Sequence, residues 1–278
     1  MNKRSLFYSL SPRLRFLVRR LYFLPSDIYA GITGKRHPME PPKGLIYTGH
    51  GDFIAHGMRH LGYLKKFAQL RPEHHVLDVG SGMGRSAAAL TTYLSNEGHY
   101  DGFDVVKLGV DWCTKKITSR FPNFHFRYID LKNDLYKSKG ADAIQFIFPY
   151  PETNFDIVFL MSVFTHMSVP EIEHYLDEIH KVLKPGGKCL ATFFYFDEAT
   201  LQSIKTGTTA IKFDTDRGHY RLTDAGVTSA NICIEYSYLK NMIESRGFKI
   251  NETIKGYWRN FAEKKDNDYQ DMIVMEKN

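Results

Sequence analysis

Residues 75–84 constrain the fold of this chain more than any other segment. They read HVLDVGSGMG, an apolar run with one acid followed by glycines at every second position. The apolar run predicts a buried parallel strand. Glycine allows a sharp turn and a close approach to a ligand, because it has no Cβ. A helix is expected to start at Arg85, so the segment predicts a nucleotide-type binding loop between a strand and a helix.

The glycine spacing alone does not choose the nucleotide. The dinucleotide fingerprint is Gly-x-Gly-x-x-Gly, and counted from Gly80 it requires glycine where this chain has Arg85. Counted from Gly82, the pattern ends on Ala87, which a dehydrogenase tolerates. Asp78 distinguishes between the possible nucleotides better than the glycine spacing does, because an acid in an apolar strand is costly to bury without a partner. We expect Asp78 to organise the glycine loop and to face a cationic ligand, while an NAD-linked oxidoreductase stays open as an alternative.

Composition and charge narrow the class of protein. The chain has 278 residues, of which 43% are apolar and 24% charged, and these shares are typical of a globular domain. Residues 1–43 carry nine Lys and Arg against two acids, so the rest of the chain is close to neutral. A neutral body argues against a nucleic-acid groove. The three cysteines are far apart, which predicts neither a disulfide framework nor a metal site and indicates a cytoplasmic protein.

The first 43 residues predict a basic amphipathic arm. Apolar residues recur there at helical spacing with arginines between them; they are Leu14, Leu17, Val18, Leu21 and Leu24. Such a helix suits the anionic inner face of a membrane, and packing on the domain or on a partner subunit is the plainer alternative. We expect a membrane-surface or subunit contact through residues 1–43, followed by the main domain at 44–278. No apolar run is long enough for a transmembrane helix.

From residue 75 the pattern alternates strands and helices, which predicts an α/β domain with a mostly parallel sheet. The expected strands are 76–79, 100–104, 124–129, 155–161, 188–196, 248–255 and 272–276. The expected helices are 85–95, 110–120, 170–183 and 235–246. Ser168 and Glu171 have the spacing of a capping box at the start of the third helix. Residues 197–233 are polar and show no clear period, which predicts an irregular insertion.

Several motifs together resemble the class I S-adenosylmethionine (SAM)-dependent methyltransferases. Asp78-x-Gly80-x-Gly82-x-Gly84 is similar to their motif I, and Asp104 ends the next strand, where an acid can accept hydrogen bonds from both ribose hydroxyls. The run 155–158 and the corner 182–188 are also similar to that family. The resemblance covers about residues 70–200. It implies a Rossmann-like three-layer sandwich, with a seven-stranded, mostly parallel sheet and one antiparallel strand near the C-terminus.

The resemblance also implies a SAM site at the glycine loop and the strand ends. Its expected members are Asp78, Gly80, Ser81, Gly82, Gly84, Asp104, Asp130, Ser162 and Val163. Asp130 would receive the adenine amino group, although a strand-end aspartate also starts turns well. His166 is the expected base, because imidazole takes a proton near neutral pH; its alternative role is to orient the following helix. His50 and Asp52 are rival bases if residues 49–52 fold over the site.

Further segments look like a bacterial methyltransferase subgroup that often accompanies sugar and surface-polysaccharide biosynthesis. They are Gly51-Asp52-Phe53, Tyr100–Asp104, Trp112-Cys113, Phe121–Phe124, Ser162–Met167 and Gly256-Tyr257-Trp258. The likeness implies a small-molecule acceptor, a saccharide or related metabolite methylated on a hydroxyl oxygen. A methyltransferase-like protein that binds SAM without turnover is a further alternative.

Overall fold

A seven-stranded sheet forms the centre of the computed structural model, with the strand order β10-β11-β5-β4-β1-β2-β3. The structure describes residues 12–49, 51–132, 140–224, 226, 231–260 and 268–278. Strand β11 pairs antiparallel with both β5 and β10, and the other neighbours in the sheet pair in parallel. The predicted mostly parallel sheet with one antiparallel strand near the C-terminus is therefore confirmed.

Six of the seven strands begin and end within one residue of their predicted limits, whereas β5, predicted at 188–196, starts five residues earlier and ends three residues earlier. Their bounds are β1 His75–Val79, β2 His99–Asp104, β3 Phe124–Tyr128, β4 Phe155–Leu160, β5 Leu183–Phe193, β10 Phe248–Ile254 and β11 Asp271–Lys277. The longer β5 starts directly at the end of the preceding helix. It contains Gly186, whose positive φ of 73° explains why a glycine occupies this corner.

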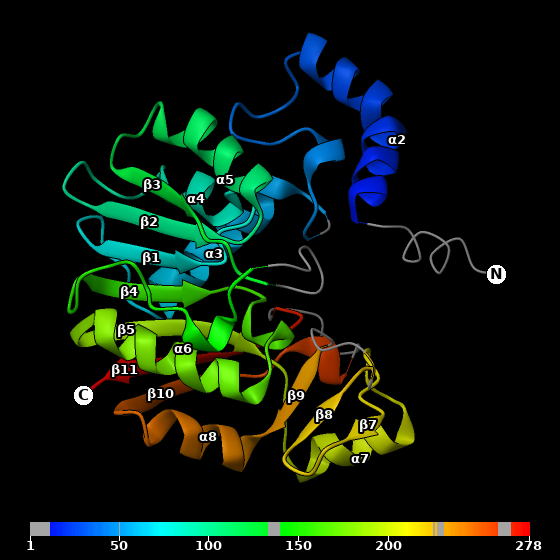
Figure 1. Ribbon diagram of the computed structural model, residues 1–278, viewed down its shortest axis with the longest axis vertical. Coiled ribbons are helices and arrows are strands. Elements are labelled where there is room, and N and C mark those ends of the chain that lie inside the picture. The colour runs from blue at the N-terminus through cyan, green and yellow to red at the C-terminus, as the bar shows by residue number, and fades with distance from the viewer. Residues whose placement is uncertain (1–11, 50, 133–139, 225, 227–230, 261–267) are drawn as a thin grey trace.

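Helices cover both faces of the sheet and complete three layers (Figure 1). One face carries α3 Phe53–Lys66, α4 Arg85–Leu90 and α5 Lys107–Cys113; the other carries α6 Val169–Val182 and α8 Tyr236–Glu244. Alternate residues of each strand pack on opposite faces: Leu77 lies with α6 and α8, whereas Val76 lies with α3 and α4. The alternation places a separate apolar core on each side of the sheet.

Two helix predictions need correction at their ends. Helix α4 stops at Leu90 instead of residue 95, and α5 starts earlier than predicted and continues as a π-helical turn, Thr114–Thr118. The predicted capping box is confirmed, because the Ser168 amide donates to the Glu171 carboxylate at 2.7 Å at the start of α6.

The prediction of an irregular segment at 197–233 was wrong. This part of the chain contains helix α7, Glu198–Thr206, which begins with Asp197 accepting from the Thr200 amide at 2.8 Å. It also contributes to a second, four-stranded sheet in the order β6-β9-β8-β7. The bounds are β6 Tyr195–Phe196, β7 Thr215–Asp216, β8 Tyr220–Leu222 and β9 Ile232–Glu235. Strands this short present too few residues for an alternating pattern to show.

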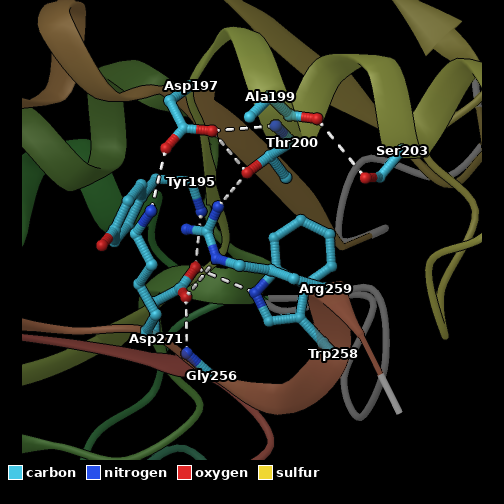
Figure 2. A network of polar contacts seen from close by, with 10 residues as sticks. Tyr195, Asp197, Ala199, Thr200, Ser203, Gly256, Trp258, Arg259 and Asp271 are labelled. Atoms are coloured by element: carbon cyan, nitrogen blue, oxygen red, sulfur yellow. Dashed lines mark hydrogen bonds and ion pairs between the residues drawn. The ribbon is translucent and has the colours of Figure 1, made fainter. Parts of the chain in front are cut away.

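Polar contacts around Asp271 fasten this second unit to the central sheet (Figure 2). Asp271 opens β11 and is fully buried, and its carboxylate accepts from the Gly256 amide at 2.8 Å and the Trp258 indole at 2.9 Å. It also pairs with the Arg259 guanidinium at 3.0 Å. Arg259 in turn donates to the Thr200 hydroxyl of α7. One buried carboxylate therefore ties β11, the segment before it and α7 together.

The N-terminal arm contains helix α2, Pro12–Ile32, which lies beside the layers of the domain (Figure 1). Its apolar side chains face solvent; Leu14, Leu17, Leu21, Leu24 and Ile28 are 43–62% exposed. The carboxylate of Asp27 accepts from the Lys43 and Gly44 amides at 2.7 and 2.9 Å, which anchors the helix to the following linker. Within the described residues, no helix combines the length and hydropathy needed to cross a membrane.

Candidate functional site

A cavity of about 330 Å³ opens at the carboxyl ends of β1, β2 and β4, and we call it the strand-end cavity. This edge of a parallel sheet is where open α/β folds bind ligands. Its wall includes Tyr47, Gly80, Gly82, Asp104, Asp142, Ser162, Val163 and His166. Five of these wall residues are sequence-predicted donor-site residues, and they come from three different strand ends.

The glycine loop is held in place by β2. The amides of Gly80 and Ser81 both donate to the Phe103 carbonyl, at 2.9 and 3.0 Å. Gly80 has a φ of 82°, and a Cβ there would lie 2.5 Å from Cγ2 of Val163. Only glycine therefore lets the loop pass Val163 and reach the cavity wall. Ser81 is buried, and its hydroxyl finds no hydrogen-bond partner among the described residues.

Asp104 ends β2 beneath the glycine loop, and its carboxylate lines the strand-end cavity. It accepts from the amides of Gly82 and Val106, both at 2.8 Å, and from the Tyr47 hydroxyl at 3.4 Å. Burial raises the pKa of Asp104, whereas these hydrogen bonds act to lower it. The side chain thus shapes the loop and presents an acceptor to the cavity at the same time.

Asp78 lies within β1 and is buried more deeply than Asp104. It is 2% exposed, and the Tyr100 hydroxyl donates to it at 2.6 Å. Burial raises the pKa of Asp78 to about 7, and the nearby Asp104 carboxylate adds to the rise, while the Tyr100 hydrogen bond opposes it. The side chain also borders the second cavity described below.

Two predicted cofactor residues lie outside the cavity walls. Gly84 caps α4 with a φ of 79°, and a Cβ there would lie 2.6 Å from the Cys113 sulfur. It serves the close packing of α4 on α5. Asp130 is exposed and bonds to the Tyr128 hydroxyl at 3.4 Å. Asp142 lines the strand-end cavity instead, brought there by a bridge between Leu131 and Ala141.

A second cavity of about 490 Å³ adjoins the first on the side of α3 and α4, and we call it the helix-side cavity. The two cavities share part of their walls; the shared residues are Thr48, Gly80, Gly82, Met161, Ser162 and His166. The remaining wall of the second cavity contains the charged and polar residues His56, Arg59, His60, Arg85 and Asp268 beside apolar ones such as Phe53. The two cavities therefore form adjoining compartments on either side of one shared wall.

Ser162 and His166 stand on the shared wall after β4. Ser162 has a positive φ of 61°, an uncommon conformation for a residue with a side chain. Its amide donates to the Thr192 hydroxyl at 2.7 Å, and its hydroxyl donates to Gln270 at 2.9 Å. His166 closes a single 3-10 turn, Phe164–His166, whose last amide bonds to the Val163 carbonyl at 2.9 Å. Backbone strain at Ser162 turns the chain so that both residues reach the two cavities.

Asp52 and His50 were the predicted alternatives to His166 as the base. Asp52 is exposed and caps α3, accepting from the Ala55 amide at 2.8 Å, and it borders neither cavity. A capping carboxylate stabilises the helix start by satisfying an unpaired amide, so the geometry gives Asp52 a structural position. His50 lies outside the described residues.

Residues that sequence reasoning missed come mostly from the helices. The sequence pointed to Arg85 only as a helix start and as the residue in place of a fingerprint glycine, and it did not single out His56, His60 and Asp142 as site residues. His56 and His60 are one helical turn apart on α3, and this spacing is the one local signal that they share a face. Nothing in the spacing of Asp142 relates it to the strand ends.

Comparison with known proteins agrees with this geometry. Residues 76–187 match the family model described as a methyltransferase domain. The chain is 28% identical over 134 residues to Phosphoethanolamine N-methyltransferase 2 of Caenorhabditis elegans, covering 48% of this chain and 27% of that protein. It is 27% identical over 144 residues to the Uncharacterized methyltransferase YcgJ of Bacillus subtilis, covering 50% and 47%. The chain thus spans between about a quarter and about half of the length of these relatives.

A solved structure extends the likeness to most of the chain. The PH0226 protein of Pyrococcus horikoshii OT3 superposes with a TM-score of 0.56 at 15% identity, covering 83% of this chain and 93% of that one. At this identity the likeness concerns the fold. Residues 76–187, which include most of the glycine loop, are therefore similar to a methyltransferase domain, and this similarity implies SAM as the cofactor.

Proposed function

We propose that the protein transfers a methyl group to a hydroxyl oxygen of a small-molecule acceptor, a saccharide or a related metabolite. The observation that carries the proposal is the wall shared by the two cavities, which includes Gly80, Ser162 and His166. Two reactants held in adjoining compartments meet at a fixed geometry, and such positioning supplies a large part of the rate acceleration in bimolecular reactions.

The residues of the strand-end cavity fit SAM. The Gly80 turn leaves room where a Cβ would collide. The buried Ser81 hydroxyl follows in the same loop, on the wall of the adjoining helix-side cavity, and has no protein partner among the described residues. Asp104 would accept hydrogen bonds from the ribose hydroxyls. Asp142 takes over the adenine contact first expected of Asp130, because Asp142 borders the cavity. Bound SAM would supply a methyl group activated by the positive sulfur.

His166 is the proposed proton acceptor. Its ring borders both cavities, so it can reach a hydroxyl group of the acceptor beside the donor compartment. Its imidazole would take the hydroxyl proton while the methyl group leaves the sulfur of SAM for the oxygen, and it would return that proton to water afterwards. The alternative is that His166 only orients α6, which begins three residues later.

The size of the acceptor follows from the second cavity. A volume of about 490 Å³ falls within the range of about 300–1,000 Å³ typical of small-molecule sites. The relative from Caenorhabditis elegans carries the name of an enzyme for a small amine, which also supports a small acceptor. The hydroxyl oxygen and the saccharide rest on the resemblance described for the sequence.

A SAM-consumption screen tests the proposal. The full-length protein is incubated with SAM and a panel of nucleotide sugars, glycans and phenolic acids, and the demethylated product and any methylated acceptor are measured by mass spectrometry. Acceptor-dependent turnover that falls about a hundredfold in His166→Gln, with unchanged binding of S-adenosylhomocysteine (SAH), supports the base. SAH binding without turnover on any acceptor favours a binding protein. Binding of NAD in place of SAH would overturn the proposal.

A separate proposal concerns the arm: α2 contacts an anionic membrane surface. Its apolar face is exposed, and the first 43 residues carry a net charge of +7. Exposed leucines combined with basic residues suit insertion among anionic lipid headgroups. Liposome flotation compares the full-length protein with a version that lacks residues 1–43, on phosphatidylserine and on phosphatidylcholine vesicles. Equal flotation of both proteins removes the membrane contact, and a loss of dimer on truncation would assign the face to a partner subunit.

A further inference from the structure

Arg85 carries a charge that no acid of the described residues neutralises at close range. It is the first residue of α4, and its guanidinium lines the helix-side cavity. Its Nη2 donates to the Thr48 carbonyl at 3.2 Å, and the group lies 5.3 Å from the ring centre of Phe53. The buried Nε has no hydrogen-bond partner within the described structure. No carboxylate of the described chain lies within the 4.0 Å of an ion pair.

An arginine in this position lowers the stability of the folded protein. Burial lowers the pKa of Arg85, and no neighbouring acid acts in the other direction. A partly desolvated cation without a counter-charge costs several kcal/mol unless hydrogen bonds or a ligand compensate for it. The guanidinium has five N–H donors in a planar fork, and Thr48 accepts from one of its nitrogens. The remaining donors suit an oxyanion.

One neighbouring group, Arg59, adds a second positive charge to this wall. His56, Arg59 and His60 line the same cavity. Burial lowers the pKa of His60 to about 3, with Arg85 as the next cause, so its ring is neutral near pH 7 and bonds to the Ser86 hydroxyl at 2.8 Å. Burial also lowers the pKa of His56, and both arginines add to the effect.

The acids on the wall of the helix-side cavity come from other segments than its cations. Asp78 is engaged by the Tyr100 hydroxyl at 2.6 Å, and Asp268 accepts from the Tyr269 amide, also at 2.6 Å. Asp268 raises the pKa of His56, as does Asp52, but both effects are smaller than those of the arginines. The cations come from α3 and α4, whereas Asp268 comes from the segment before β11. The cavity therefore has a cationic wall on its helical side.

We infer that Arg85, with Arg59 at the cavity rim, forms a subsite for an anionic group of the methyl acceptor, either a carboxylate or a phosphate. Arginine recognises both groups through paired hydrogen bonds. The inference rests on the proposed function, because the subsite borders the compartment assigned to the acceptor. An acceptor anchored at Arg85 would present the rest of the molecule to the shared wall that holds His166.

Arg85 also packs against the segment before α3, so its binding role must be separated from a structural one. A Cβ on Gly49 would lie 2.2 Å from Nη1 of Arg85, which shows how closely the backbone covers the guanidinium. Arg85→Gln removes the charge and part of this packing, whereas Arg85→Lys keeps the charge but not the fork. Arg59→Gln changes an exposed rim residue whose loss leaves the packing intact. Arg71→Gln is the control, because Arg71 is exposed and borders neither cavity.

The experiment titrates the full-length protein with inorganic phosphate and with acetate, at constant ionic strength, by NMR and calorimetry, with and without SAH. The wild type should bind at least one of the two anions, and which one it prefers identifies the group. Affinity should fall about tenfold in Arg85→Gln and about threefold in Arg59→Gln, with Arg71→Gln unchanged. SAH affinity should stay within about twofold in all variants.

Anion binding that survives in both Arg85→Gln and Arg59→Gln would overturn the subsite, and so would a wild type that binds neither anion. If Arg85→Gln does not fold, the same titration of Arg85→Lys and Arg59→Gln tests the subsite. A wild type that binds phosphate but not SAH would keep the subsite while removing the proposed function. A wild type that binds SAH but neither anion would remove the subsite while keeping the proposed function.

Discussion

The Tyr100 hydroxyl donates a hydrogen bond of 2.6 Å to the Asp78 carboxylate between the two adjacent strands β1 and β2. Tyr100 is fully buried and Asp78 nearly so. Both partners sit directly beneath the glycine loop, and the pair replaces the water that a carboxylate would otherwise keep. The hydrogen bond therefore allows Asp78 to occupy an apolar strand, although burial raises the pKa of its carboxyl group.

This pair predicts a specific dependence of stability on pH. The pKa of Asp78 is about 7 in the folded protein, above its ordinary value of 3.8, because burial disfavours the carboxylate. Between about pH 4 and pH 7 the folded state therefore holds a proton that the unfolded state releases, so the free energy of unfolding falls as pH rises through this window. Asp78→Asn removes the contribution, and the difference between wild type and variant should change by about 4 kcal/mol from pH 4 to pH 8.

Urea unfolding of both proteins across this pH range measures the difference. Other groups with altered pKa values, such as His60, contribute equally to both proteins and cancel. Parallel stability curves for wild type and Asp78→Asn would show that Asp78 titrates normally in the folded protein.

Asp104→Ala should weaken SAH binding by at least about tenfold, because the variant loses the proposed ribose acceptor and leaves the Gly82 and Val106 amides unpaired. Asp130→Ala is the matched control: Asp130 also follows a strand, but it is exposed and borders neither cavity. Calorimetry with SAH compares the two. Equal losses in both variants would contradict the assignment of the ribose site to Asp104.

Asp142→Ala should weaken SAH binding by about threefold to tenfold, if its carboxylate receives the adenine amino group. The comparison with Asp130→Ala decides which acid has this role, because the structure places only Asp142 on the wall of the strand-end cavity. Binding of the base is isolated by repeating the titration with adenosine. A loss confined to Asp130→Ala would restore the original expectation from the sequence.

Gly84→Ala should destabilise the protein more than Gly186→Ala. Both glycines have a positive φ, 79° and 73°, so each variant strains the backbone by about 1 kcal/mol. At Gly84 the new Cβ would also lie 2.6 Å from the Cys113 sulfur, whereas at Gly186 nothing lies within 4 Å. The overpacking should add about 1–3 kcal/mol, measured as the difference in unfolding free energy between the two variants. Equal losses would mean that α4 and α5 move apart without cost.

Asp271→Asn should destabilise the protein by about 3–5 kcal/mol, because it leaves the buried Arg259 guanidinium without its counter-charge. The ion pair between the exposed Lys255 and the half-buried Asp197, at 3.1 Å, provides the control, and Lys255→Gln should cost no more than about 1 kcal/mol. Thermal and urea unfolding report both. A small loss in Asp271→Asn would mean that the second sheet is held to the central sheet mainly by its apolar contacts.

The order of the main strands and the α6 cap could be predicted from the sequence, because both depend on local patterns. A buried strand such as β4 needs a run of apolar residues, and a helix start needs a capping side chain three residues from its partner. The same local signal is absent from β7 and β8, which have two and three residues. Strand β8 takes its place in the sheet by pairing with β9, more than ten residues beyond Tyr220, and β7 takes its place by pairing with β8.

The strand-end residues Gly80, Asp104 and His166 were recognisable in advance because parallel strands bring their carboxyl ends to one edge. The sequence by itself thus determined the class of fold, the glycine loop and the nature of the donor. Tertiary structure alone decided that Gly84 packs on α5, that Asp142 replaces Asp130 at the cavity, and that Arg85 faces the helix-side cavity. These relations join segments that are far apart along the chain, and no local pattern encodes a contact that depends on how whole layers pack.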